Sequence, residues 1–511
     1  MPGAVAAGGV SGVATALAFP PYDAGPLAFF SLIPLALVFR AGRGAGGARR
    51  VAAASAVFGL VFFGLLFPWI HLFGAAAYVL LVALEAAFVV VFLLAGLLIH
   101  RRLPAALGPL VFGTAFLAGE FLRSHGPLGG FPWGGLGYSQ HNDAAILRLA
   151  AYTGVWGISL LIATVNALLA EVAVLLRPLA ALARGLTPAG VLGRLGIAAA
   201  LVLLPGLLPV SSPSGAPVTL GLVQRPPPQK GAPDAPGQQS LASEVALTSG
   251  LVGRHVDLVV WPESSFDRDP LTASDLAGPL LASIRATGAS FVVGATVDAP
   301  GPKFRNESMF FLPDGTLAAR YVKIHLVPFG EYVPARRLLA GWIHELDKVP
   351  ADGIAGTSPT VFSLPHGDFG SVICYETAYP ELVGAFVAKG ARMIVVSTNN
   401  ASYKRTAASA QMVALGQLRA AEQRMWVAQA ALTGISAVIA PNGQVTERTG
   451  LFDTAVLTPT VRFARGTTVY GRYGDWLPAA LLVGGAGAAL AGLRRPKAAP
   501  KGAPKGAAGA P

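Results

Sequence analysis

Three residues of this sequence, Glu263, Lys323 and Cys374, have side chains that together could perform acyl transfer. Each follows a short apolar run that resembles a β-strand, and strand ends are where the functional groups of α/β proteins gather. A cysteine thiol with a pKa of about 8.5 is mostly protonated at neutral pH and needs a base or a cation to become reactive. Glu263 could accept the thiol proton, Lys323 could stabilise the thiolate and a later oxyanion, and Cys374 could carry an acyl thioester.

Each of these residues also has a purely structural interpretation. A lone cysteine after an apolar run is more often packed in a core than used as a nucleophile. A lone lysine or glutamate usually lies on a solvated surface. Spacing along the chain does not bring the three together, so the catalytic interpretation depends on the elements that position them.

The segment 211–472, which carries these residues, has the pattern of an α/β domain. Short β-rich runs alternate with helical stretches, which we expect at 275–287 and 407–431. Asp314-Gly315 and Asn442-Gly443 are residue pairs typical of β-hairpin turns. The β-rich runs lie at 218–223, 258–261, 291–294, 372–374, 393–397 and 437–440.

The chain as a whole is too hydrophobic for an ordinary soluble enzyme. Of its 511 residues, 53% are hydrophobic and 13% are charged, and the mean hydropathy is +0.57. We therefore expect a polytopic α-helical membrane domain with about eight transmembrane helices, of which the first two are short. The expected spans are 4–19, 26–38, 51–69, 75–99, 106–121, 147–176, 192–208 and 477–493.

The distribution of charge predicts how the chain is oriented. The net charge is +12, but the excess is concentrated in short basic loops beside the apolar spans. Such loops are typical of the cytoplasmic side, whereas a nucleic-acid footprint would mark the folded domain. We therefore expect no nucleic-acid partner, both termini in the cytoplasm, and a catalytic domain on the periplasmic face of a bacterial inner membrane. The basic residues of these loops are Arg40, Arg43, Arg49, Arg50, Arg101, Arg102, Arg177, Arg184, Arg194, Arg494, Arg495, Lys497, Lys501 and Lys505.

Two acidic residues, Glu85 and Glu120, lie inside expected spans, where an ionisable group is costly and usually has a partner or a task. Arg123 follows Glu120 by one helical turn, so we expect these two to pair. The sequence offers no evident partner for Glu85.

The single cysteine excludes an intrachain disulfide and any CxxC redox or zinc motif, and we expect neither a metal nor a cofactor. The first apolar segment lacks the basic region of a cleavable signal peptide, which predicts a retained helix. The expected organisation is a membrane domain at 1–210, a catalytic domain at 211–472, a last membrane helix at 473–495 and a disordered cytoplasmic tail at 496–511.

The three candidate residues lie in motifs that resemble those of the nitrilase-like carbon-nitrogen hydrolases. That superfamily has a Glu-Lys-Cys triad, and its motifs match Trp261-Pro-Glu263, Tyr321-Val-Lys323-Ile-His325 and Cys374-Tyr375-Glu376 in the same order. The longer run from Lys323 to Pro334 is similar to one branch in particular, the apolipoprotein N-acyltransferases, which join such a domain to eight membrane helices. Segments 130–133 and 137–140 resemble the part of that family between its fifth and sixth helices.

The resemblance implies an α-β-β-α sandwich and a two-step reaction. An acyl chain would pass from a membrane phospholipid to Cys374, and then to the α-amino group of the lipidated N-terminal cysteine of a diacylated apolipoprotein. By motif, Glu263 is the base, Lys323 the oxyanion stabiliser and Cys374 the nucleophile. Glu331 would orient the lysine and contact the attacking groups, and Tyr375 and Glu376 would shape the pocket beside the thiol.

Two segments depart from the family pattern. After Ser397-Thr398-Asn399 the family usually has an Asp-Ala-Trp-Phe-Gly-like loop, whereas this chain has Asn-Ala-Ser-Tyr-Lys at 400–404. Near the start of the domain, Arg225 and three prolines stand where relatives tend to have a Gly-Asn-Ile-Pro-Gln-like run followed by a Trp. Because the triad motifs and Glu331 are intact, we expect the chemistry to be retained and substrate handling to differ.

Two other functions are compatible with parts of the sequence. In a membrane-tethered amidase or nitrilase, water instead of an amine would resolve the thioester. A transporter with an accessory domain would account for the number of spans and for Glu85 and Glu120. The transporter hypothesis predicts Gly/Pro-interrupted spans at matching positions in two related halves, and the sequence shows no such symmetry.

Overall fold

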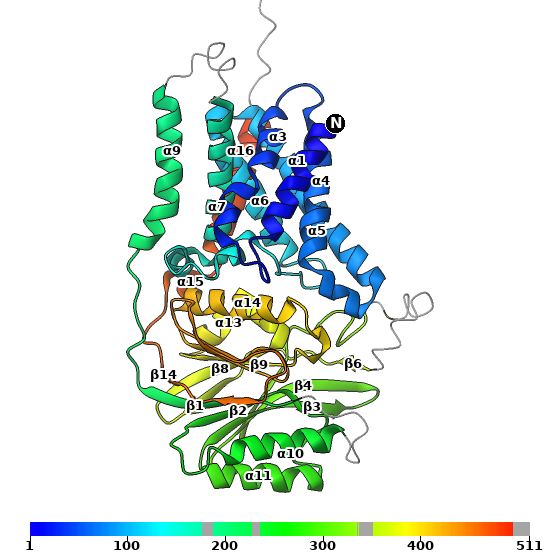
Figure 1. Cartoon of the computed structure of the whole chain (residues 1–511), viewed down its shortest axis with the longest axis vertical. Helices are drawn as coiled ribbons and strands as arrows, with labels where there is room; N and C mark the ends of the chain where they lie inside the picture. Colours follow the sequence, from blue (N-terminus) through cyan, green and yellow to red (C-terminus); the bar gives the residue numbers. More distant parts are fainter. Residues whose placement is uncertain (176–187, 227–235, 335, 337–350, 494–511) are drawn as a thin grey trace, which may run out of the picture.

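The computed structural model describes residues 1–175, 188–226, 236–334, 336 and 351–493 (Figure 1). The expected tail at 496–511 lies outside the described residues, as do the basic residues at 177 and 184. A bundle of helices stands on an α/β part whose helix α14, Ala408–Gln423, lies across the bundle axis. The structure therefore has the two parts that the hydrophobicity pattern predicts.

The bundle contains five helical segments that are long and apolar enough to cross a membrane, counted over the described residues. Gly25–Ala41 and Trp476–Gly485 are shorter apolar helices, and the first helix has 15 residues. A polytopic membrane domain is confirmed, and a total of eight spans stays a prediction. The helices of the bundle are α1 Pro2–Ala16, α2 Ala28–Ser31, α3 Ile33–Ala41, α4 Gly47–Leu66, α5 Ala75–Arg102, α6 Gly108–Arg123, α7 Ala150–Leu175, α9 Pro188–Leu203 and α16 Trp476–Leu493.

The ion pair that Arg123 forms differs from the expected one. Arg123 Nη1 lies 2.8 Å from Glu85 Oε2 on the neighbouring helix α5, and it also donates to the carbonyl oxygens of Phe131 and Trp133. Glu120 Oε1 instead accepts the Leu136 N–H at 2.7 Å. The predicted pairing of Glu120 with Arg123 is therefore wrong, because Arg123 at the end of α6 reaches across to α5, and helical spacing reveals neighbours on one helix only.

The α/β part contains two sheets that pack face to face. In the first, the strand order is β13-β1-β2-β3-β4-β5, with β14 beside β1 and β6 beside β4; in the second it is β12-β11-β10-β9-β8-β7. The strands are β1 Pro217–Gln224, β2 Leu258–Phe266, β3 Ser290–Ala299, β4 Lys303–Phe311, β5 Leu317–Val322, β6 Asp352–Gly353, β7 Val361–Leu364, β8 Gly367–Ile373, β9 Ile394–Thr398, β10 Val427–Ala431, β11 Ala437–Ile439, β12 Val445–Arg448, β13 Ala455–Leu457 and β14 Thr460–Arg462.

Helices cover the outer face of each sheet, which completes the expected α-β-β-α sandwich. α10, Pro236–Ser249, and α11, Ser274–Thr287, lie below the first sheet, while α13, Pro380–Ala388, and α14 lie between the second sheet and the bundle (Figure 1). Central strands such as β9 are buried along their whole length, which explains why their sequences are continuous apolar runs. A short helix, α15 Val469–Tyr473, leads back into the bundle.

Two local predictions need correction. The helix expected over 407–431 ends at Gln423, because Arg424 adopts a left-handed conformation with φ +51° and Val427–Ala431 forms β10 between β9 and β11. The run 258–261 does not end before Glu263, since β2 continues to Phe266 after its register with β3 shifts beyond Trp261. The two hairpin turns occur where expected, with Gly315 and Gly443 at positive φ.

Candidate active site

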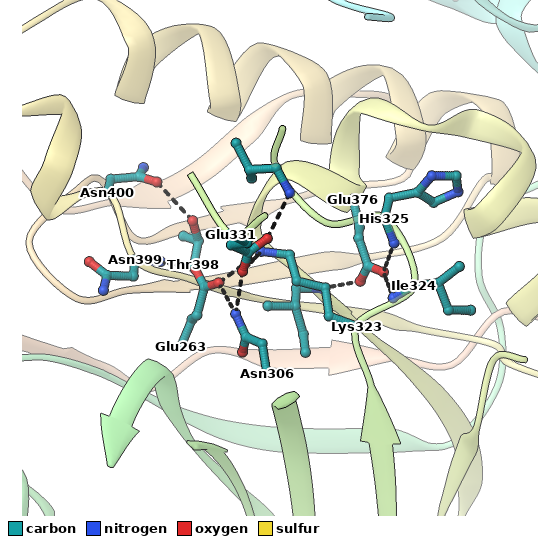
Figure 2. Close-up of polar contacts among 12 residues, drawn as sticks. Glu263, Asn306, Lys323, Ile324, His325, Glu331, Glu376, Thr398, Asn399 and Asn400 are labelled. Atoms are coloured by element: carbon teal, nitrogen blue, oxygen red, sulfur yellow. Dashed lines mark hydrogen bonds and ion pairs between the residues drawn. The ribbon is translucent and has the colours of Figure 1, made fainter. Parts of the chain in front are cut away.

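Lys323 is held between two carboxylates in the interior of the α/β part. Its Nζ lies 3.0 Å from Glu263 Oε1 and 2.9 Å from Glu331 Oε1, and its side chain is 1% exposed (Figure 2). Burial by itself would favour the neutral amine, but the charges of the two carboxylates outweigh it and hold the pKa of Lys323 well above its usual value. The ammonium is therefore a fixed positive charge.

Asn306 on β4 connects the same two glutamates. Its Nδ2 donates to Glu263 Oε1 at 2.7 Å and to Glu331 Oε1 at 2.9 Å (Figure 2). Its main-chain oxygen accepts the Lys323 N–H at 2.8 Å, so the asparagine and the lysine lie side by side where β4 and β5 pair. Sequence reasoning missed Asn306, because it lies between Arg305 and Glu307 in a polar run that no motif singles out.

Backbone donors fix the remaining carboxylate oxygens. Glu263 Oε2 accepts the Asn399 N–H at 2.7 Å, and Glu331 Oε2 accepts the Val327 N–H at 2.8 Å. Both oxygens of each glutamate therefore accept hydrogen bonds, which fix the orientation of each carboxylate. This arrangement brings Glu263, Lys323 and Glu331 together, although the first lies 60 residues before the second.

Cys374 stands at a sharp turn between β8 and a short 3-10 helix, Cys374–Ala378. Its φ of +52° is in the left-handed region, which is rare for a residue with a Cβ and often marks a functional site. Burial, together with the charge of Glu263, raises the pKa of the thiol to about 12, against the opposing effects of Lys323 and of the Thr398 hydroxyl. The resting group is therefore a thiol that must lose its proton to a base before it can attack.

Glu376 positions the turn that carries the cysteine. Its Oε1 accepts the Ile324 N–H at 2.7 Å and the His325 N–H at 3.1 Å (Figure 2). The same oxygen accepts the Tyr321 hydroxyl at 2.7 Å, and Oε2 accepts the Ile373 N–H at 2.8 Å. Burial raises the pKa of Glu376 to about 7 against these hydrogen bonds. Since both oxygens bind protein donors, this residue acts by connecting the Cys374 turn to the loop after Lys323.

Tyr375 faces the membrane bundle. Its hydroxyl lies 3.4 Å from the carbonyl oxygen of Gly130, and its ring stacks near Trp133 with a centroid separation of 6.4 Å. Tyr379 donates to the Tyr375 hydroxyl at 3.1 Å and also contacts Gly130. The structure therefore places Tyr375 at the junction between the thiol turn and the segment 130–133.

The divergent loop at 400–404 packs its tyrosine under the bundle. The ring centroid of Tyr403 lies 5.1 Å from that of Trp69 and 6.2 Å from that of Phe73, both from the 3-10 helix Pro68–Phe73. Burial raises the pKa of Tyr403 well above its usual value, and the nearby Cys374 adds to this effect. Tyr403 was not among the residues selected from the sequence, yet it connects the site with the membrane helices.

Near the start of the domain, Arg225 has a structural role. Its Nε lies 3.1 Å from Glu244 Oε1 in a buried pair, and Ser265 donates to the same oxygen at 2.8 Å. The residues that follow, 227–235, lie outside the described part of the chain.

Comparisons with known proteins cover both parts of the chain. A family model for the apolipoprotein N-acyltransferase N-terminal domain matches residues 11–168, and a carbon-nitrogen hydrolase model matches residues 219–469. The apolipoprotein N-acyltransferase of Geobacter metallireducens is 32% identical over 95% of this chain and 94% of its own length. That of Gloeobacter violaceus is 30% identical over 91% of this chain and 89% of its own length. Because these similarities span the membrane helices and the nitrilase-like domain alike, the chain belongs to the apolipoprotein N-acyltransferase family of membrane enzymes.

Proposed function

We propose that this chain transfers an acyl chain from a membrane phospholipid to Cys374, and from there to the α-amino group of the N-terminal diacylglyceryl-cysteine of an apolipoprotein. Membership of the family supports the reaction type. The observation that carries the assignment of residues is the buried cluster of Lys323, Glu263 and Glu331, whose charges act on the nearby Cys374 thiol.

In the first step, Glu263 takes the thiol proton and the sulfur attacks the ester carbonyl carbon of the phospholipid. The ammonium of Lys323 stabilises the oxyanion of the tetrahedral intermediate. When the intermediate collapses, the carbon-oxygen bond to the glycerol breaks, and Glu263 returns the proton to the departing alkoxide. The products are a lysophospholipid and an acyl thioester on Cys374.

In the second step, the lipoprotein amine attacks the thioester carbonyl. Glu263 accepts a proton from the amine, Lys323 again stabilises the oxyanion, and the carbon-sulfur bond breaks to release the amide. The proton then returns to the Cys374 thiolate. Glu331 and Asn306 hold the lysine and the base in place throughout, and Tyr375 and Glu376 position the turn that carries the sulfur.

The attachment to a membrane bundle follows from the chemistry of both substrates. Each buried methylene group of an acyl chain is worth about 0.8 kcal/mol, so a soluble enzyme would have to extract a long chain from the bilayer at great cost. The aromatic contacts of Tyr375 and Tyr403 with the bundle support a route by which the chain stays in an apolar environment.

We further propose the inner-membrane orientation and the domain limits expected from the sequence. The start of α1 and the end of α16 lie at the end of the bundle remote from the sandwich, which supports cytoplasmic termini and a periplasmic catalytic domain at 211–472 (Figure 1). The membrane domain then comprises 1–210 and 473–495.

The test follows the acyl group on purified protein. After incubation with phospholipid, intact mass spectrometry should detect an acyl adduct on the wild type and none on Cys374→Ala, and Glu263→Gln should form it more slowly. A diacylated lipopeptide should discharge the adduct, whereas the same lipopeptide with an acetylated amino terminus should not. If no adduct forms, or if water clears it as fast without the lipopeptide as with it, the transferase proposal is wrong.

A further inference from the structure

A second polar pocket lies at the far end of α14 from the candidate active site. Its interior, about 10 Å³, has room for one water-sized group and opens to solvent. The pocket is bounded by the linker that follows the α9 segment, by the end of α14 and by the segment that leads into α15. The 16 residues of α14 span about 24 Å at 1.5 Å per residue, so this pocket is separate from the loop that carries Tyr403. Its lining residues are Ser211, Ser212, Pro213, Gln423, Arg424, Ala464, Arg465, Gly466, Thr467 and Thr468.

The charge around this pocket is positive and uncompensated. Arg424 Nε donates to the carbonyl oxygen of Ser211 at 3.1 Å, and nearby Arg148 donates to that of Leu208 at 3.2 Å. Arg465 is exposed at the rim. Burial and the charge of Arg148 both lower the pKa of Arg424, and no carboxylate of the described residues lies within 4.0 Å of these three guanidinium groups. Several cations without a counter-ion favour a bound anion.

Gln423 supplies an independent sign of a missing ligand. Its side chain is 2% exposed, and neither Nε2 nor Oε1 has a hydrogen-bond partner in the described structure. A buried amide that makes no hydrogen bond is costly, and native proteins rarely leave one unsatisfied. Because Gln423 lines the pocket, a ligand there could satisfy its donor and its acceptor together.

The pocket lies at the level where the chain leaves the membrane. Ser211 follows within a few residues of the apolar segment Ala189–Leu207, and α15 on the opposite wall leads directly into α16 (Figure 1). These arginines are at the sandwich end of the bundle, so the positive-inside rule does not account for them. A phospholipid headgroup combines a negative charge at this level with hydroxyl groups that the Gln423 amide can bond.

We propose that this pocket binds the phosphate of an anionic phospholipid headgroup, with Arg424 and Arg465 contacting the phosphate oxygens and the Gln423 amide bonding to the phosphoglycerol group. The bound lipid is a structural ligand at the membrane surface, distinct from the acyl donor at Cys374. It would fix the sandwich against the bilayer on the side opposite Tyr403.

Native mass spectrometry of the delipidated full-length protein tests this directly. Phosphatidylglycerol, diacylglycerol with the same chains, and inorganic phosphate are titrated separately into the wild type and into Arg465→Gln and Arg424→Gln. Loss of one charge-assisted contact should weaken the tightest phosphatidylglycerol site about tenfold. Diacylglycerol, which lacks the phosphate, should bind all three proteins equally. Arg285→Gln on α11, remote from the membrane, is the matched control and should bind like the wild type.

Arg465 is exposed, so its variant should fold normally even if Arg424→Gln does not, and gel filtration checks both. Equal phosphatidylglycerol affinity in wild type and Arg465→Gln would overturn the proposal. The proposal would also be overturned if Arg465→Gln weakened diacylglycerol binding as much as it weakened phosphatidylglycerol binding, since apolar contacts would then explain the effect. If inorganic phosphate binds in an arginine-dependent manner while phosphatidylglycerol affinity does not change, the ligand is free phosphate and the lipid assignment is wrong.

Discussion

At the scale of single residues, the candidate site combines a fixed cation with a thiol that is hard to ionise. The pKa of Lys323 lies well above its usual value because two carboxylates contact it, and burial together with Glu263 raises the pKa of Cys374 to about 12. A persistent thiolate is therefore absent at neutral pH. In the proposed mechanism, Glu263 must therefore take the thiol proton before the sulfur can attack.

The ionisation of Cys374 can be measured without interference from other thiols, because the chain has one cysteine. The rate of alkylation by iodoacetamide should rise about tenfold per pH unit from pH 7 to 10 with no plateau, since the thiolate fraction grows at that rate below the pKa. The urea-unfolded chain, as a control, should level off above its ordinary pKa of about 8.5. A plateau below pH 9 in the folded protein would contradict this prediction.

Asn306 should matter for catalysis although no motif contains it. Asn306→Leu keeps a similar side-chain shape but removes the donor shared by Glu263 and Glu331, so both carboxylates lose a defined orientation. Hydrogen bonds to charged groups are worth about 1.5–3 kcal/mol, so acyl-adduct formation on Cys374 should slow by about tenfold or more. Asn142→Leu, at an exposed site remote from the cluster, should form the adduct at the wild-type rate. An unchanged rate in Asn306→Leu would show that the network tolerates its loss.

At the scale of elements, the site requires that two loops keep a fixed position relative to each other. The turn after β8 carries Cys374, and the loop after β5 carries Lys323; Glu376 accepts hydrogen bonds from both. The expectation that Glu376 shapes the pocket beside the thiol stays a prediction. A buried carboxylate suits the position because it offers acceptors only, and every group that faces it is a donor.

Glu376→Gln should therefore weaken both the fold and the reaction. The amide replaces one acceptor oxygen with a donor NH₂ group and leaves either the Ile373 N–H or the donors at Oε1 without a partner. The free energy of unfolding should fall by about 1–3 kcal/mol, and adduct formation should slow because the sulfur and the ammonium lose their alignment. Glu447→Gln, on the exposed strand β12, is the matched control for thermal unfolding and adduct assays. Wild-type values for both measurements in Glu376→Gln would contradict this role.

At the scale of the whole molecule, a few polar side chains connect the sandwich to the bundle. Gln411 Oε1 accepts the indole N–H groups of Trp69 at 3.1 Å and Trp133 at 2.9 Å, and its Nε2 donates to the carbonyl oxygens of Pro20 and Leu66. Gln411 lies on α14, the helix that follows the Tyr403 loop. Its hydrogen bonds therefore attach this helix to the bundle.

Removing that connection should loosen the junction without unfolding either part. Gln411→Leu leaves two buried indole N–H groups and two carbonyls without partners, so hydrogen exchange should accelerate in α14 and in the helix Pro68–Phe73. Exchange in β2 and β3, in the other sheet, should stay unchanged. Gln444→Leu, in an exposed turn, is the control. Equal exchange in α14 of Gln411→Leu and the wild type would mean that apolar packing alone holds the junction.

Local patterns in the sequence predict the fold class and select Glu263, Lys323 and Cys374 as candidate site residues. Hydrophobic spans, alternating β-rich and helical runs and the motifs around Glu263, Lys323 and Cys374 are local patterns, and local patterns persist in the folded chain. The predicted helix over 407–431 is too long, because its alanine-rich run favours a helix locally, while pairing in the centre of a sheet favours the strand β10.

Which side chains meet depends on the tertiary structure. Arg123 pairs with Glu85 instead of Glu120, Asn306 joins the two glutamates, and Tyr403 and Gln411 join the site to the membrane helices. None of these contacts has a signature in local spacing, because each connects side chains from different helices, strands or layers. Their geometry depends on how the elements pack, and packing is a property of the whole chain.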